Sequence, residues 1–158
     1  GCLYFGLMLT ADGPKVIEYN CRFGDPEAQV VLPLLESDLL EVMQAVTEER
    51  LAEQEVKFSS GAACCVVMAS DGYPKKYEKG YEITIEDSVK DYVYVAGAKI
   101  VDGKLLTDGG RVLGVIAKGD DIAKAIDAAY KNVDFVHFDN QYYRSDIGQK
   151  ALKALKEV

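Results

Sequence analysis

The first apolar stretches of the chain predict a β-hairpin. Residues 3–9 are almost entirely apolar, and residues 15–23 alternate between apolar and polar side chains. The run Asp12-Gly13-Pro14 lies between them and is rich in turn-forming residues. We therefore expect two antiparallel strands joined by a tight turn.

Helix-start signals follow the hairpin twice. Asp25-Pro26 predicts a short helix that ends near Pro33, with Asp25 as the N-cap and Pro26 at the first helical position. Asp38, followed three residues later by Glu41, predicts a capping box. A second helix is therefore expected over residues 38–53.

The remaining residues predict a small sheet and two further helices. Strands are expected over residues 62–69, 81–85, 92–101, 104–107 and 111–117. Asp102-Gly103 is a strong signal for a two-residue hairpin turn. Apolar side chains at helical spacing predict a helix over residues 121–133, capped by Gly119-Asp120, and a last helix after Asp146, its expected N-cap. Together these elements indicate an α+β protein with a seam near residues 54–61.

Composition and charge narrow the function classes. The chain has 158 residues, of which 49% are hydrophobic and 28% charged, so it is able to bury a core. Its 26 acidic residues outnumber 18 basic ones, for a net charge of -8. This argues against nucleic acid and anionic membrane surfaces as partners, because both attract basic proteins. No apolar run approaches the roughly 18 residues of a membrane span.

The cysteines and the first residues bear on the origin of the chain. Cys2, Cys21, Cys64 and Cys65 lack the paired spacing of a metal site, and we expect reduced thiols in a cytoplasmic protein. The chain opens directly on an apolar strand. We therefore expect it to be a piece of a longer polypeptide.

The strongest candidate chemistry lies on the second expected strand. Glu18, Asn20 and Arg22 recur at every second position, so we expect them on one face, about 7 Å apart along the strand. Carboxylate and amide oxygens are donors that Mg²⁺ prefers, and a guanidinium binds phosphate or carboxylate. The pattern fits a face with a metal end and an anion end. The solvated face of an ordinary hairpin carries the same residue types, and alternation alone leaves both interpretations open.

The run Gly24-Asp25-Pro26-Glu27 follows directly. Gly24 permits close approach of a ligand, and a helix N-terminus binds anions through its free N–H groups. Helix capping and the helix dipole also explain Asp25 and Glu27. Two acidic groups would repel a phosphate, so they suit a ligand that carries an amine or a bridging metal.

The run Glu18-Tyr19-Asn20-Cys21-Arg22-Phe23-Gly24-Asp25-Pro26-Glu27-Ala28-Gln29 closely resembles the diagnostic stretch of the phosphoribosylamine–glycine ligase family, in the ATP-grasp superfamily. Other motifs follow in the family's order: Leu3-Tyr4-Phe5-Gly6-Leu7-Met8, Gly72-Tyr73-Pro74 with Tyr77 and Gly80, Thr107-Asp108-Gly109-Gly110-Arg111-Val112-Leu113, and Arg144-Ser145-Asp146-Ile147-Gly148. The resemblance covers essentially the whole chain. It implies the C-terminal part of the enzyme, without the N-terminal domain and most of the ATP-grasp module.

The resemblance also implies an architecture. Residues 1–55 would be the C-terminal part of the ATP-grasp domain, a hairpin plus helices. Residues 56–158 would be a small C-terminal α+β domain with a mixed or antiparallel sheet and flanking helices.

The activity implied by the resemblance is the ATP-dependent joining of glycine to 5-phosphoribosylamine, through a glycyl phosphate, in de novo purine biosynthesis. Mg²⁺ or Mn²⁺ would accompany ATP, which is a co-substrate. The partners implied are ATP, glycine, 5-phosphoribosylamine and the missing N-terminal part of the same enzyme. This segment alone is expected to be inactive, because most of the ATP site is missing.

Roles carry over by position in the family's motif. Glu18 and Asn20 are the expected metal ligands. Arg22, Asp25 and Glu27 are the expected catalytic groups, with Arg22 at the transferring phosphoryl or acyl phosphate and the two acids near the substrate amine. The expected substrate-binding residues are Gly24, Gly109, Gly110 and Arg111. For Gly109-Gly110-Arg111 the ligand would be a phosphate, such as that of the ribose, although a tight turn between strands also explains the glycines.

Other residues and other function classes offer alternatives to this assignment. His137, the single histidine, is expected to be a partly buried structural residue. Another ATP-grasp carboxylate–amine ligase would share Glu18 and Asn20, but the continuation Arg-Phe-Gly-Asp-Pro-Glu argues against it. A non-catalytic α+β interaction module, in which the first strand pairs with another chain, is the third possibility.

Overall fold

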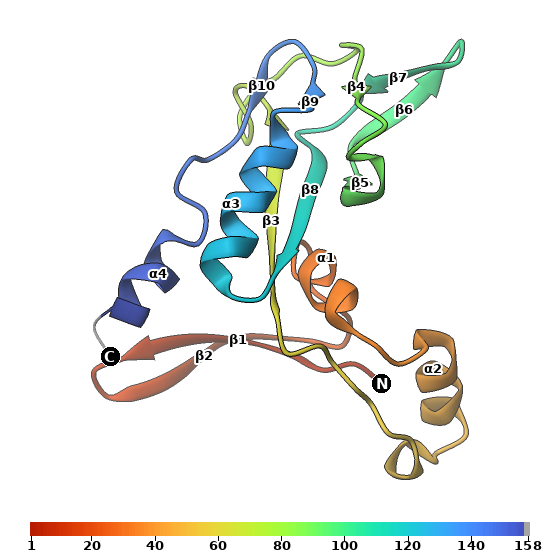
Figure 1. Ribbon diagram of the computed structural model, residues 1–158, viewed down its shortest axis with the longest axis vertical. Helices are drawn as coiled ribbons and strands as arrows, with labels where there is room; N and C mark the ends of the chain where they lie inside the picture. Colours follow the sequence, from red (N-terminus) through yellow and green to blue (C-terminus); the bar gives the residue numbers. More distant parts are fainter. Residues whose placement is uncertain (157–158) are drawn as a thin grey trace. The chain divides into compact units, whose positions relative to one another are not determined.

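The computed structural model describes residues 1–156, and the chain divides into two compact units on either side of the Ser59–Ser60 bond. The first unit begins with strands β1 (Tyr4–Thr10) and β2 (Gly13–Asn20), which form an antiparallel hairpin (Figure 1). The expected hairpin is confirmed. The second strand was expected to reach Phe23 but ends at Asn20, because Asn20 pairs with Tyr4 and β1 has no residue that pairs with Cys21.

The helical part of the first unit departs from the sequence expectation at its start. Helix α1 (Ala28–Val31) runs into the 3₁₀ turn η1 (Leu32–Leu34). Glu27, not Asp25, holds the N-cap position, because the N–H of Ala28 closes a turn onto the carbonyl of Gly24 and residues 25–27 lie inside that turn. Asp25 instead accepts a hydrogen bond of 3.0 Å from the side-chain amide of Gln29.

The second helix confirms the expected cap and is shorter than expected. In α2 (Leu39–Thr47), the Asp38 carboxylate accepts hydrogen bonds from the N–H groups of Leu40 and Glu41. The helix was expected to continue to residue 53. It stops because Glu49 adopts a left-handed backbone (φ 55°), and a separate 3₁₀ turn, η2 (Leu51–Glu53), follows.

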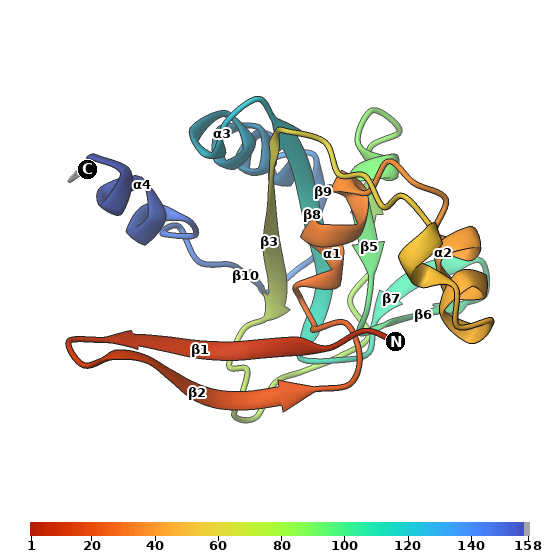
Figure 2. The ribbon, with the colours of Figure 1, turned by 90° about the horizontal axis from the view of Figure 1, so that it is seen from below.

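The second unit is built on a four-stranded antiparallel sheet. Its strands lie in the order β10 (Gln141–Tyr142), β3 (Ala62–Ser70), β8 (Arg111–Gly119) and β5 (Val93–Val95). Helix α3 (Ile122–Val133) packs along β3 and β8, as Figures 1 and 2 both show. The buried core lies between them. It includes Val66, Met68, Val115, Ala129 and Phe138, all fully buried.

Smaller elements complete this unit. Strands β6 (Ala98–Val101) and β7 (Lys104–Thr107) form the hairpin that Asp102-Gly103 predicts, and both turn residues have positive φ. Strands β4 (Thr84–Ile85) and β9 (Val136–His137) form a short pair. The turn η3 (Lys90–Tyr92) precedes β5, and helix α4 (Gln149–Lys156) follows β10.

The structure differs from the sequence expectation at four further places. The strand expected over 92–101 is interrupted, because the backbone at Gly97 packs against Gly109 and the chain then leaves the sheet. The strand expected over 81–85 is reduced to Thr84–Ile85. Asp121, whose carboxylate accepts from the N–H of Lys124, caps α3 in place of Gly119-Asp120. His137 is exposed, not partly buried, because it is the outward residue of an edge pair.

The α+β fold class is confirmed, with antiparallel sheets and four α-helices in residues 1–156. None of the helices in this range has the length and apolar character needed to cross a membrane.

Candidate functional site

Glu18 and Asn20 lie side by side on one face of β2. The side-chain amide of Asn20 donates to the carboxylate of Glu18 at 3.1 Å. The alternation of β2 therefore places this pair as the sequence predicts. Rotating the Asn20 amide by half a turn would bring its oxygen to the point now taken by its nitrogen. Two oxygen donors would then face one position.

Tyr4 joins this pair from the neighbouring strand. It lies opposite Asn20 in the hairpin, and its hydroxyl donates a hydrogen bond of 3.1 Å to the carboxylate of Glu27. That bond raises the pKa of the Tyr4 phenol, with further contributions from burial and from the charges of Glu27 and Glu18. Tyr4, Glu18, Asn20 and Glu27 therefore form one polar cluster, which we call the hairpin cluster.

Two glycines make room for the carboxylates of the hairpin cluster. A Cβ atom on Gly6 would lie 2.9 Å from Cγ of Glu18, and one on Gly24 would lie 2.2 Å from Oε2 of Glu27. Both distances are shorter than ordinary contacts, so a larger residue at either position would displace the acid. Gly24 is buried.

Arg22 and Asp25 lie beyond the end of β2. Strand alternation therefore does not place Arg22 on the face of Glu18 and Asn20, and its guanidinium donates to the carbonyl of Phe23 at 2.8 Å. Asp25 is exposed and bound to Gln29. The side-chain amide oxygen of Gln29, Oε1, is buried with no hydrogen-bond partner within residues 1–156. An unpaired acceptor here suits a ligand with N–H donors.

The hairpin cluster offers few oxygen donors, and these would suit a cation that is also bound by the phosphates of a nucleotide. No group of three or more His, Cys, Asp or Glu side chains in the described part of the chain could hold a metal ion. Mg²⁺ usually takes one or two protein carboxylates together with substrate phosphates and water. Glu18, together with the Asn20 amide oxygen once that amide is rotated, would offer two oxygen donors of this kind.

Gly109, Gly110 and Arg111 form a tight turn in the second unit. Ser70 binds this turn twice: its N–H donates to the carbonyl of Gly110 and its hydroxyl to that of Gly109, at 2.8 and 3.0 Å. The N–H of Gly97 donates to the carbonyl of Arg111 at 2.9 Å. The ring of Tyr73 covers Gly110, where an added Cβ would lie 2.1 Å from it. These contacts fix the three carbonyl groups. Within residues 1–156, the N–H groups of Gly109 and Gly110 donate to no protein acceptor.

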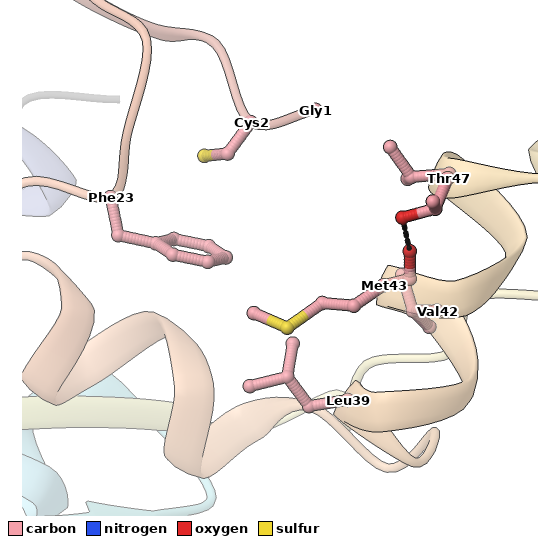
Figure 3. Close-up of a pocket in the computed structure, with 8 residues that line it drawn as sticks. Gly1, Cys2, Phe23, Leu39, Val42, Met43 and Thr47 are labelled. Atoms are coloured by element: carbon pink, nitrogen blue, oxygen red, sulfur yellow. Dashed lines mark hydrogen bonds between the residues drawn. The ribbon is translucent and has the colours of Figure 1, made fainter.

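An apolar cavity of about 290 Å³ lies elsewhere in the first unit (Figure 3). Its lining comes from the first residues of the chain, from Phe23 and from one side of α2. The hydroxyl of Thr47 is bonded to the carbonyl of Met43 at 3.1 Å. No lining side chain is a charged acid or base, so this cavity lacks the groups that the expected chemistry needs.

Comparison with known proteins assigns the family. Residues 63–150 match the family described as "Phosphoribosylglycinamide synthetase, C domain", and residues 1–28 match the one described as "Phosphoribosylglycinamide synthetase, ATP-grasp (A) domain". The fold and the matches define the class: part of a synthetase of the ATP-grasp type. The chain belongs to the phosphoribosylglycinamide synthetase family.

Individual relatives agree with this assignment. The chain is 48% identical to a phosphoribosylamine–glycine ligase of Caldanaerobacter subterraneus over 93% of its own length and 36% of the relative's. It is 51% identical to the trifunctional purine biosynthetic protein adenosine-3 of Gallus gallus, over 99% of this chain and 16% of that one. The crystal structure of phosphoribosylamine–glycine ligase from Thermotoga maritima aligns with a TM-score of 0.75 at 38% identity, over 92% of this chain and 36% of that one. The chain thus spans about a third of the length of the ligases it matches.

Sequence reasoning assigned no role to Tyr4, Ser70 or Tyr73. Tyr4 and Tyr73 were present in the quoted motifs, but a motif does not say which side chains meet. The alternation of β1 does place Tyr4 on the face that carries Glu18 and Asn20, once the register of the hairpin is known. Ser70 is buried at the end of a strand, and only its contacts with the turn at Gly109 reveal its function there.

Proposed function

We propose that this chain supplies part of the active site of an ATP-dependent ligase that joins glycine to 5-phosphoribosylamine. The observation that supports this most directly is the hairpin cluster. It places Glu18, Asn20 and Glu27 together in the segment that resembles the family's diagnostic stretch. The two family matches and the ligases among the relatives support the same assignment.

In the proposed reaction, the glycine carboxylate takes the γ-phosphoryl group of ATP and becomes an acyl phosphate, and ADP is the leaving group. The amine of phosphoribosylamine then attacks the acyl carbon, phosphate leaves, and the amine loses a proton. Bound Mg²⁺ or Mn²⁺ would offset charge on the ATP phosphates. Glu18 and Asn20 would hold that ion.

The remaining groups divide between the anionic and the cationic parts of the substrates. Arg22 would stabilise the transferring phosphoryl group, because a guanidinium matches phosphate oxygens. Asp25 and Glu27 would face the substrate amine, and the unpaired acceptor on Gln29 lies in the same segment. Gly24 leaves the space that the Glu27 carboxylate occupies.

In the second unit, Gly109, Gly110 and Arg111 would bind the phosphate of phosphoribosylamine. Two N–H groups without protein acceptors, next to a guanidinium, are suited to phosphate oxygens.

We further propose that the segment acts within a longer chain, whose other ATP-grasp residues cover the apolar face of the hairpin. Leu7, Ile17 and Tyr19 expose 51–62% of their surface there. An apolar face of this size is usually covered in a working protein. In this arrangement residues 1–55 belong to the ATP-grasp domain and residues 56–158 to the C-terminal domain, and the isolated segment has no ligase activity.

The test is Glu18→Gln in a full-length ligase that contains this segment. We expect turnover to fall on the order of 100-fold or more, because several kcal/mol of charge stabilisation depend on a bound metal ion. Glu53→Gln, at an exposed glutamate of the same unit, is the matched control and should retain activity. Near-normal turnover of the Glu18 variant over a full range of metal concentrations would remove Glu18 from the metal site.

A further inference from the structure

The hydrogen bond from Tyr4 to Glu27 spans 23 residues of the chain. Tyr4 opens β1, whereas Glu27 lies just before α1. The bond therefore connects the hairpin directly to the segment that follows it. Such a bond orders both partners, and one to a charged acceptor is stronger than a neutral one.

The helix does not hold the Glu27 side chain. Glu27 occupies the N-cap position of α1 but makes no side-chain capping bond. Its carboxylate is held instead by the Tyr4 hydroxyl on Oε1, while Oε2 lies over Gly24. Removing the hydroxyl would leave a glutamate with three rotatable bonds and no other hydrogen-bond partner for its carboxylate in residues 1–156.

Tyr4 also lies next to Glu18 and Asn20, the proposed metal ligands. It lies directly opposite Asn20, at the spacing of cross-strand neighbours, whose Cβ atoms are about 5 Å apart. It also experiences the charge of Glu18. One side chain thus sets the position of Glu27 relative to Glu18 and Asn20.

We propose that Tyr4 is a positioning residue, which holds the Glu27 carboxylate where it accepts the ammonium group of the amino-acid substrate. This rests on the proposed function, in which Glu27 lies near a substrate amine, and it takes that amine to be the ammonium group of glycine. Tyr4 touches neither substrate nor metal in this scheme and acts through Glu27.

The experiment uses Tyr4→Phe in a full-length ligase, because phenylalanine keeps the ring and removes only the hydroxyl. We expect KM for glycine to rise about 10-fold or more, as befits one hydrogen bond to a charged group. KM for ATP and the metal concentration at half activation should not change. Tyr19→Phe is the matched control: Tyr19 is on the other face of the same hairpin, with its ring 5.1 Å from that of Phe5, and should leave KM for glycine unchanged.

A double-mutant cycle separates positioning from a structural effect. In a Glu27→Gln background, Tyr4→Phe should add little to the rise in KM for glycine. Additive effects, an unchanged KM for glycine in Tyr4→Phe, or equal rises in KM for glycine and ATP would overturn the proposal.

The cycle also distinguishes this inference from the proposed function. If Glu27→Gln raises KM for glycine and Tyr4→Phe does not, only the role of Tyr4 fails. If Glu27→Gln leaves KM for glycine unchanged, the role of Glu27 fails and that of Tyr4 fails with it. A thermal-unfolding cycle on the same four proteins reports whether the hydrogen bond exists in either case.

Discussion

The hydroxyl of Ser70 donates a hydrogen bond of 3.0 Å to the carbonyl oxygen of Gly109, and Ser70 is completely buried. The bond joins the end of β3 to the turn before β8, 39 residues later. A buried polar pair of this kind is costly to break, because the partner left behind loses water without gaining another donor.

Ser70→Ala should therefore lower the free energy of unfolding by about 1–3 kcal/mol. Urea denaturation followed by tyrosine fluorescence is suitable, since the chain has ten tyrosines and no tryptophan. Ser88→Ala, at an exposed serine of the same unit, should change stability by less than about 0.5 kcal/mol. Equal effects of the two substitutions would mean that the bond to Gly109 contributes nothing.

Gly97→Ala and Gly110→Ala should lower the free energy of unfolding by different amounts. A Cβ on Gly97 would meet the backbone of Arg111 and Gly109 at 2.5 and 2.7 Å, which cannot move without breaking the turn. A Cβ on Gly110 would meet the ring of Tyr73, which is 43% exposed and free to rotate outward. We expect about 3 kcal/mol for Gly97→Ala and about 1 kcal/mol for Gly110→Ala. Denaturant midpoints in the reverse order would contradict this account of the turn.

Phe138 is the largest fully buried side chain of the core. Phe138→Ala should destabilise the second unit by about 3–5 kcal/mol, because it removes buried surface and leaves a cavity. Phe135 is 43% exposed, and Phe135→Ala is the control, with an expected loss of no more than about 1 kcal/mol. The two losses, measured by thermal unfolding followed by circular dichroism, should differ by more than their errors.

Arg111 provides a functional test of the turn in the second unit. In a full-length ligase, Arg111→Ala should raise KM for phosphoribosylamine about 10- to 100-fold, the equivalent of one charge-assisted hydrogen bond. KM for glycine and for ATP should stay the same. Arg50→Ala, which removes an arginine of the first unit that is paired with Glu48, is the control. A parallel rise in all three KM values would indicate a general disturbance rather than a phosphate contact.

Stability should depend on pH through Arg144 and Asp146. Two hydrogen bonds from the Arg144 guanidinium, at 2.8 and 2.7 Å, lower the pKa of the Asp146 carboxyl. An acid whose pKa is lower in the folded state stabilises the fold above its ordinary pKa of about 4 and loses that contribution as the pH falls through the lowered value. The difference in unfolding temperature between the wild type and Asp146→Asn should therefore be largest near neutrality and disappear in acid. If the difference in unfolding temperature persisted below pH 2, it would not come from the pairing of Arg144 with Asp146.

Local sequence was sufficient for the elements whose cause is local. Asp102-Gly103 predicts its hairpin because few residues other than glycine, asparagine and aspartate readily adopt the positive φ that the turn needs. Asp38 predicts the start of α2 because its cap bonds reach only two and three residues ahead. Apolar periodicity placed α3 within a residue of its observed start, and the family motifs indicated the family to which the chain belongs.

Tertiary structure decided what depends on partners distant in the sequence. β2 ends at Asn20 because its partner strand β1 begins at Tyr4. The sequence alone determined the α+β class and the residue types of the candidate site. Only the fold showed that Tyr4 meets Glu27 and that Ser70 holds Gly109, since both contacts join segments whose separation is set by chain folding and not by any local spacing.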